Sequence, residues 1–229
     1  MDLFHRQQEP ENRELVWIKP FDNRMEEILR LKEKSETCPE QMKKVFLSAW
    51  GELASKVKVH QQIANQIIES GLPLRVYYNV VITTDMGSAS LDFLILSQQW
   101  IIPLVVKNKE HIEWDRYDTR FAKTPDAVDV RMAEDAACLL MDWLADNRAI
   151  TKKDMQRVVP VLIDEEAETL ENMPELEPSI LYPEMCAAVR VRPEDLSSWL
   201  DQERSIDGAL QFPAKKMDKI LEVISQVLS

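Results

Sequence analysis

Two charged residues border strongly apolar stretches of this chain, and their types could do chemistry. Asp92 interrupts the apolar segment 90–96, and Lys107 directly follows the apolar segment 100–106. A charge on a buried strand is costly unless it is paired or bound to a ligand. If the two segments are neighbouring strands, Asp92 and Lys107 can form an ordinary ion pair. Alternatively, the carboxylate holds a metal ion and the ammonium group stabilises negative charge that develops during a reaction.

Other common site motifs are absent. The chain has only 4 glycines and no Gly-rich phosphate-binding motif, which disfavours mononucleotide and dinucleotide sites. Its cysteines form no CxxC pair, which predicts buried, reduced thiols in a cytoplasmic protein. Its histidines lack ligand spacing, so a histidine-based zinc site is not expected. These residues are Cys38, Cys138, Cys186, His5, His60 and His111.

Composition limits the partners. The 229 residues carry 28 basic and 40 acidic side chains, so the net charge is -12. Such a charge repels phosphate backbones at long range, although locally sorted charge can still bind nucleic acid. The polar N-terminus is not typical of a signal peptide, and no apolar run approaches the roughly 20 residues of a membrane helix. We therefore expect a cytoplasmic location and no membrane partner.

Hydrophobic periodicity predicts an α/β protein. Segments 90–96 and 100–106 are apolar on both faces, as expected for the centre of a sheet that helices cover. Pro103 lacks a ladder donor and predicts a bulge or a sheet edge. We expect an extended arm over 1–22 that ends in a turn at 17–20. The predicted strands are 75–83, 90–96, 100–106, 157–163 and 185–191, and the predicted helices are 25–36, 39–70, 126–147, 193–204 and 213–228.

The stretch from Asp92 through Val105, Lys107 and Asn108 resembles the nuclease-related domain (NERD) family. That family belongs to the restriction-endonuclease-like PD-(D/E)xK group and shows an acidic residue, a short turn and an apolar strand that ends in Glu-x-Lys-Asn. Gly51-Glu52 is similar to the family's helical Gly-Glu, and Thr124-Pro125 to its Asn-Pro segment. The resemblance covers roughly residues 45–229.

The resemblance implies a restriction-endonuclease-like central mixed sheet flanked by helices, with an N-terminal helical extension. We divide the chain into an N-terminal arm and short helix, 1–38, and a nuclease-related α/β domain, 39–229. The implied catalytic residues are Glu52, Asp92 and Lys107, and the implied metal ligands are Asp92 and Glu52. The cofactor would be Mg²⁺ or Mn²⁺ if the domain is active; no cofactor is firmly indicated.

The sequence also departs from the family pattern. Val105 replaces the Glu of Glu-x-Lys, Trp100 replaces the usual turn Gly, and Thr124 replaces the Asn. The family's following Gln falls near Val128 and Asp129. Mg²⁺ prefers near-octahedral oxygen ligation and is held poorly by a single carboxylate. We therefore expect a degenerate domain that acts as a binding or interaction module with a lost or impaired metal site.

Two alternatives stay open. One is an active Mg²⁺- or Mn²⁺-dependent DNA nuclease in which a carboxylate has moved, with Asp129 or Glu134 as the migrated ligand. The other is a purely structural protein-interaction domain that uses its acidic face and N-terminal arm. If the scaffold is that of a nuclease, Val105→Glu should create or raise metal-dependent nicking.

Possible interaction surfaces follow from charge. Between Lys107 and Arg131 the six basic and six acidic residues cancel, so this segment is neutral in an acidic chain. It is either a nucleic-acid groove, with Trp114 and Tyr117 for base stacking, or a solvated loop. The acidic run 164–177 is expected to face solvent. The N-terminal arm can dock on its own domain, on a partner protein or on a second copy.

Overall fold

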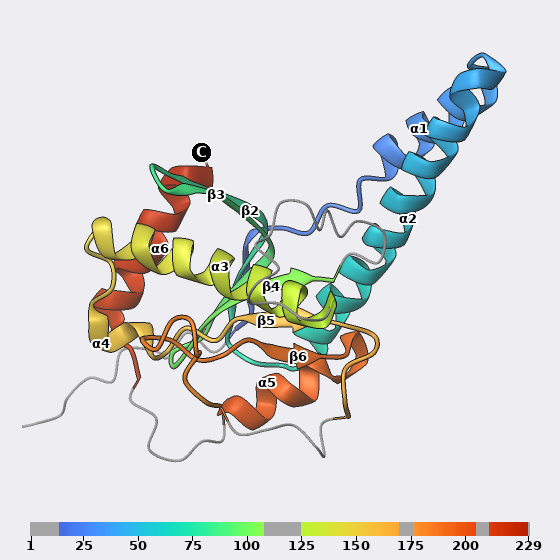
Figure 1. Ribbon diagram of the computed structural model, residues 1–229. Coiled ribbons are helices and arrows are strands. Elements are labelled where there is room, and N and C mark those ends of the chain that lie inside the picture. The colour runs from blue at the N-terminus through green and yellow to red at the C-terminus, as the bar shows by residue number, and fades with distance from the viewer. Residues whose placement is uncertain (1–13, 108–124, 170–175, 205–210, 229) are drawn as a thin grey trace, which may run out of the picture.

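A mixed six-stranded sheet forms the centre of the molecule in the computed structural model, which describes residues 14–107, 125–169, 176–204 and 211–228 (Figure 1). Strands β2, β3 and β4 are antiparallel, β1 adds in parallel to β2, and β5 and β6 add in parallel beyond β4. The order along the sheet is β1-β2-β3-β4-β5-β6. The strands are β1 Val16–Lys19, β2 Arg75–Thr84, β3 Gly87–Leu96, β4 Ile101–Val106, β5 Val161–Ile163 and β6 Val189–Val191.

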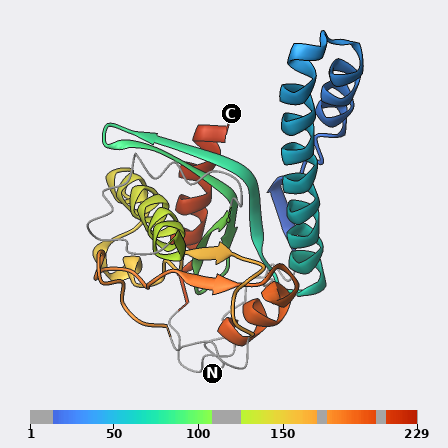
Figure 2. The same cartoon turned by 45° about the vertical axis from the view of Figure 1, so that its right-hand side comes forward.

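Helices cover both faces of this sheet, and Figure 2 shows α2 and α3 on opposite sides of it. One core lies between the sheet and helices α2 and α5, and the other between the sheet and helices α3 and α6. The expected α/β class with a mixed sheet between helices is thereby confirmed. The helices are α1 Met25–Thr37, α2 Glu40–Glu69, α3 Pro125–Asp146, α4 Lys152–Met155, the 3-10 turn Pro193–Asp195, α5 Leu196–Arg204 and α6 Ala214–Leu228. None of the helices described here is long and apolar enough to cross a membrane.

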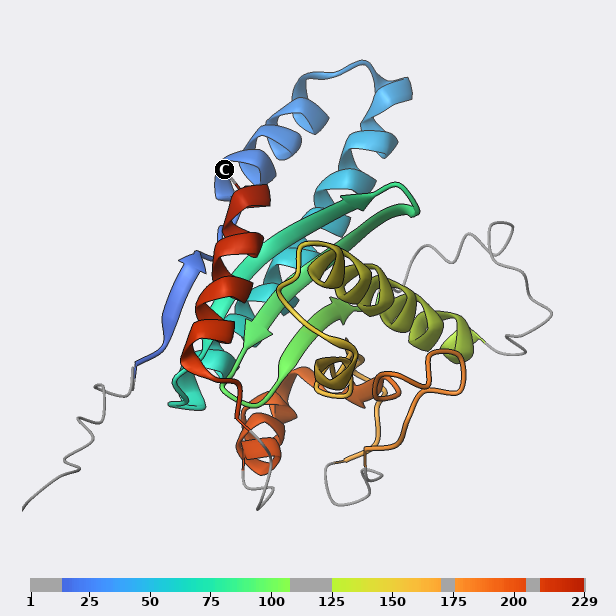
Figure 3. The same ribbon diagram turned by 90° about the vertical axis from the view of Figure 1, so that its left-hand side faces the viewer.

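Helices α1 and α2 form a hairpin that extends beyond the sheet (Figures 1 and 3). Of the 30 residues of α2, the buried ones all lie between Val57 and Ile67, so only its second half packs on the sheet. The first half packs against α1 instead. The boundary proposed at residue 38 thus falls inside this hairpin and stays an interpretation.

Three sequence-based expectations are wrong in detail. The segment 17–20 is not a turn, because Val16–Lys19 is an edge strand paired with β2. The predicted strands 157–163 and 185–191 are formed only over Val161–Ile163 and Val189–Val191. Pro103 lies neither at an edge nor in a bulge: β4 is internal, and its register with β3 is continuous. The missing amide donor of Pro103 affects the opposite side of β4. There the pairing with segment 158–163 is interrupted between the isolated Ile101–Val158 bridge and the β5 ladder.

The alternation of side chains changes once along the β2–β3 hairpin. Residues two apart on a strand normally share a face, yet Tyr78 and Val80 belong to opposite cores, as do Phe93 and Leu91. The residue between Tyr78 and Val80 is Asn79, with a φ of 52°, a left-handed conformation that Asn tolerates better than most residues. The paired register of β2 and β3 skips Asn79 and Asp92, which lie across from each other between the Tyr78–Phe93 and Val80–Leu91 pairs. Because of this irregularity, the alternation of side chains along β3 does not determine on which face of the sheet Asp92 lies.

Gly51 lies inside α2 and Gly71 lies just after its C-terminal end. Replacing each with Ala should change the free energy of unfolding in opposite directions. Gly71 follows the helix with a φ of +62°, whereas Gly51 is helical, and nothing lies within 4 Å of a Cβ at either position. Gly71→Ala should lower the free energy of unfolding by roughly 1–2 kcal/mol, because L residues are strained in this conformation. Gly51→Ala should raise it by about 0.5–1 kcal/mol. Urea denaturation measures both, and shifts of the same sign would contradict the assigned backbone conformations.

Candidate functional site

The Asp92 carboxylate is buried between the sheet and α2, where protein groups contact both of its oxygens. Its Oδ1 lies 2.9 Å from Lys56 Nζ and 3.2 Å from His60 Nε2. Its Oδ2 accepts a hydrogen bond of 2.8 Å from the Val106 amide at the end of β4. Lys56 and His60 are one helical turn apart, so α2 presents both to the same carboxylate. The carboxylate therefore connects three elements: α2, β3 and β4.

His60 extends this network into the aromatic part of the core. Its side chain is buried, and its Nδ1 lies 3.0 Å from the Tyr78 hydroxyl. The imidazole also makes edge contacts with the rings of Tyr78 and Phe93. The His60 Nε2 lies close to Asp92 Oδ1 but outside the alignment of a regular hydrogen bond. Asp92, His60 and Tyr78 thus form a continuous buried polar chain.

The contacts of Asp92 favour its ionised form. Burial by itself raises the pKa of this carboxyl, but the His60 ring, the Lys56 charge and the Val106 amide lower it by more. The net pKa lies below the ordinary value of 3.8. Asp92 is therefore a carboxylate at neutral pH, and its negative charge is balanced by α2.

Lys107 belongs to a second charged network. Its Nζ lies 3.2 Å from Asp164 Oδ2, 3.8 Å from Glu166 and 3.9 Å from Asp129. Asp164 is buried and also accepts hydrogen bonds from Arg190 and from the Glu166 amide. Burial raises the Asp164 pKa, but the Glu166 amide, Arg190 and Lys107 lower it below its ordinary value. The expectation that the acidic run faces solvent is therefore wrong for Asp164, which lies at the end of β5.

The structure does not bring Asp92 and Lys107 into one ion pair. Among the described residues, Lys56 and His60 approach Asp92, whereas Lys107 turns to Asp164. Extending the register of β3 and β4 by one residue puts Asp92 across from Val105. However, Val105 packs with the core under α3 and α6, while the Asp92 carboxylate faces α2. The interpretation that Lys107 neutralises Asp92 is thus corrected: Lys56 does so.

The other predicted ligands have separate positions. Glu52 is exposed on α2 and accepts a hydrogen bond of 2.8 Å from Ser48. Glu134 is buried and accepts hydrogen bonds from Ser179 and from the Ala188 amide, so it fixes the segment before β6. Asp129 lies beside Lys107. Within the described part of the chain, no three His, Cys, Asp or Glu side chains form a group that could hold a metal.

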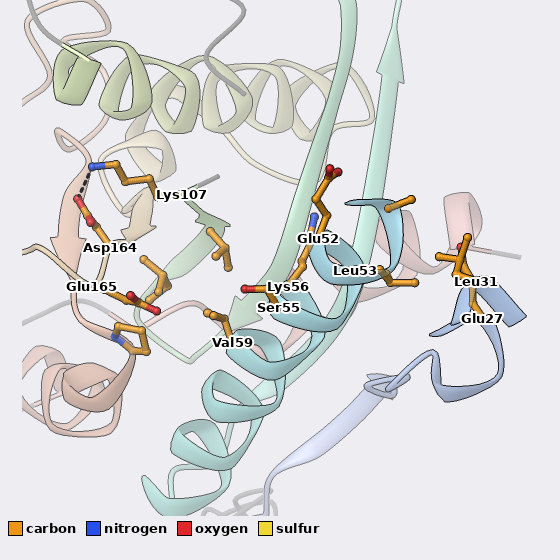
Figure 4. A pocket seen from close by; sticks show the side chains of 14 residues that line it. Glu27, Leu31, Glu52, Leu53, Ser55, Lys56, Val59, Lys107, Asp164 and Glu165 are labelled. Carbon is orange, nitrogen blue, oxygen red and sulfur yellow. Dashed lines mark hydrogen bonds and ion pairs between the residues drawn. The ribbon is translucent and has the colours of Figure 1, made fainter. Parts of the chain in front are cut away.

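A pocket of about 540 Å³ lies between α2 and the ends of β4 and β5 (Figure 4). Glu52, Lys56 and Lys107 line this pocket together with Asp164 and Glu165. The predicted residues Glu52 and Lys107 therefore share one pocket, although Asp92 is not among its lining groups. Most of the predicted nucleic-acid surface, residues 108–124 with Trp114 and Tyr117, lies outside the described residues.

No family model, no curated protein and no solved structure matches this chain. The resemblance to nuclease-related domains accordingly stays a prediction from sequence.

Replacing the buried carboxylate should produce a pH-dependent loss of stability. Because the folded pKa of Asp92 is below 3.8, ionised Asp92 stabilises the fold above that pH. This contribution is lost as the pH falls through the lowered pKa of the folded state. At neutral pH, Asp92→Asn should lower the free energy of unfolding by about 2–3 kcal/mol, since a charged hydrogen-bond acceptor is removed.

Urea denaturation at a series of pH values from neutral toward about 3 measures the difference between Asp92→Asn and the parent. Asp201→Asn, an exposed substitution on α5, serves as the control. The difference for Asp92→Asn should narrow at acid pH. A difference that stays constant over the series would show that the charge of Asp92 does not stabilise the fold.

Proposed function

We propose that this chain is a non-catalytic binding module, a degenerate relative of nuclease-related domains in which a lysine takes the place of a metal ion. The observation that carries this proposal is the saturation of Asp92. A metal-dependent phosphodiesterase needs carboxylate oxygens that are available to the metal. Here Lys56 and His60 approach one oxygen of Asp92, and the Val106 amide donates to the other.

The arrangement of elements supports the relationship to nucleases. A long helix, α2, precedes the antiparallel strands β2, β3 and β4, and these are followed by helix α3 and the parallel strand β5. The resemblance places its acidic residue on β3 and its lysine directly after β4. The separate networks of Asp92 and Lys107 support loss of the chemistry rather than its retention.

A rearranged, active nuclease is the alternative in another functional class. It would use Glu52, Asp92 and Lys107 with Asp129 as the migrated ligand. The contact between Asp129 and Lys107 is the observation in its favour. Against it, Lys56 already neutralises Asp92, so a cation there would have to displace an ammonium group.

Metal titration distinguishes the two functions. Isothermal titration of the full chain with Mn²⁺ should show no binding that depends on Asp92, and supercoiled plasmid should stay intact with Mg²⁺ or Mn²⁺. Asp92→Asn is the matched comparison, because it keeps the shape of the side chain and removes its charge. Nicking by the parent that Asp92→Asn abolishes would exclude the non-catalytic proposal.

Val105→Glu tests the kinship with nucleases. The sequence resemblance predicts a gain of Mn²⁺-dependent nicking. The packing predicts no gain, because a glutamate at 105 would extend on the α3 side of the sheet, whereas the Asp92 carboxylate faces α2. Nicking that appears in a folded Val105→Glu protein, and that also needs Asp92, would favour the family register over this packing argument.

Nucleic-acid retention tests the partner class. With a net charge of -12, the chain should show no salt-dependent retention on duplex DNA at low salt, about 50 mM. A filter-binding or gel-shift assay with plasmid fragments measures this. Retention that weakens steeply as salt rises would instead support a nucleic-acid partner that binds near Lys107–Arg131.

A further inference from the structure

Large apolar side chains are concentrated on the α1–α2 hairpin, where the rest of the molecule leaves them uncovered. The hairpin extends away from the sheet in Figures 1 and 3, so its residues 25–55 pack mainly on one another. These residues are about a sixth of the described chain, yet they include five of its 13 exposed large hydrophobic side chains: Met25, Leu29, Met42, Val45 and Leu47. Such a concentration on a projecting element marks a contact with another chain.

One side of α2 carries an apolar stripe. Met42, Val45 and Ala49 follow one another at three- and four-residue spacing, which puts them on the same side of the helix. Met42 is 45% exposed and Val45 is 58% exposed. Ala49 is small, so a second helix can approach closely there. The stripe Met42–Val45–Ala49 therefore has the composition of a helix–helix contact.

Charge is sorted along the hairpin. The hairpin tip, residues 30–44, has five basic and three acidic side chains, whereas the hairpin base, residues 25–29 and 45–55, has three acidic and no basic ones. The nearest cations beyond the base are Arg24 and Lys56, which already contact Glu27 and Asp92. Each hairpin is thus positive at its tip and negative at its base.

This polarity makes the hairpin complementary to a second, antiparallel copy of itself. When two hairpins lie side by side in opposite directions, each basic tip is next to the acidic base of the other. A two-fold axis then relates two identical contacts, which is the commonest symmetry of protein dimers. A parallel arrangement would instead put like charges together.

The acidic remainder of the chain favours the same arrangement. Residues 25–55 have five basic and six acidic side chains, so most of the net charge of -12 lies outside the hairpin, and the two bodies repel each other. The part of α2 over residues 40–55 is about 24 Å long at about 1.5 Å per residue. Antiparallel hairpins keep the bodies apart by roughly this length, about three times the screening length of about 8 Å at 0.15 M salt.

We propose that two copies of this chain associate through antiparallel α1–α2 hairpins, with the Met42–Val45–Ala49 stripe of each copy packed on the same stripe of the other. A hairpin face about 24 Å long and two helices of about 10 Å wide covers about 500 Å² per copy, less than the roughly 800 Å² of a standard interface. The dimer is therefore weak, with a dissociation constant of roughly 1–100 µM. This association goes beyond the proposed binding function and does not rest on it.

Sedimentation velocity of the full chain tests the association. Over about 1–200 µM protein, in about 0.15 M salt, the parent should change from monomer to dimer. A sedimentation coefficient that stays at the monomer value over this range would exclude a second copy as the partner of the hairpin.

The stripe is tested by a pair of exposed valines. Val45→Ser should raise the dissociation constant roughly tenfold, because a two-fold contact loses the apolar surface of Val45 from both copies. Val81→Ser, at a similarly exposed valine of β2, should change it less than about twofold. A parent-like dissociation constant for Val45→Ser would overturn the stripe as the contact.

The antiparallel arrangement is tested by charge reversal. Lys43→Glu/Lys44→Glu inverts the charge of the hairpin tip and should raise the dissociation constant roughly three- to tenfold. Lys152→Glu/Lys153→Glu is the matched control, since these adjacent exposed lysines of α4 change the net charge by the same amount elsewhere. Equal weakening by the two variants would show that net charge alone matters, which would overturn the pairing of tip with base.

Discussion

The fold depends on one buried negative charge that holds a long helix against a sheet. Asp92 reaches α2 through Lys56 and His60 and reaches β4 through the Val106 amide. Leaving such a charge without partners would cost several kcal/mol. Together with the apolar contacts of Ile63 and Ile67, the carboxylate holds α2 on the strands, and its partner Lys56 also lines the pocket.

Much of the fold could be predicted from local patterns. The strands that carry Asp92 and precede Lys107, and the long helices α2, α3 and α6, follow from apolar periodicity. Local patterns do not predict strand β1, because Val16–Lys19 is short and gains its structure from pairing with β2, a contact distant in sequence. The bulge or sheet edge predicted from Pro103 is wrong, because the missing amide donor is tolerated where the β4–β5 ladder is interrupted.

The site was predicted only in part. The sequence indicates that Asp92 needs a partner, but it does not say which cation supplies it, because Asn79 and Asp92 depart from strand alternation. A signal for His60 existed: it falls on the apolar stripe of α2 with Ile63 and Ile67, where a polar residue also needs a partner. Asp164 could have been found as the first residue after a buried strand, where carboxyl ends of parallel strands meet.

The length of α2 has a mechanical consequence. At about 1.5 Å per residue its 30 residues span about 45 Å, and only the half near the sheet is buried. The half of α2 that packs against α1 therefore extends from the Asp92 contact as an arm away from the sheet. From Lys56 to the start of α2 is about 24 Å, so a tilt of about 3–5° at the Asp92 contact moves that end, and α1 with it, by about 1–2 Å. A force applied at the tip of the α1–α2 hairpin is therefore transmitted through α2 to the Asp92 contact.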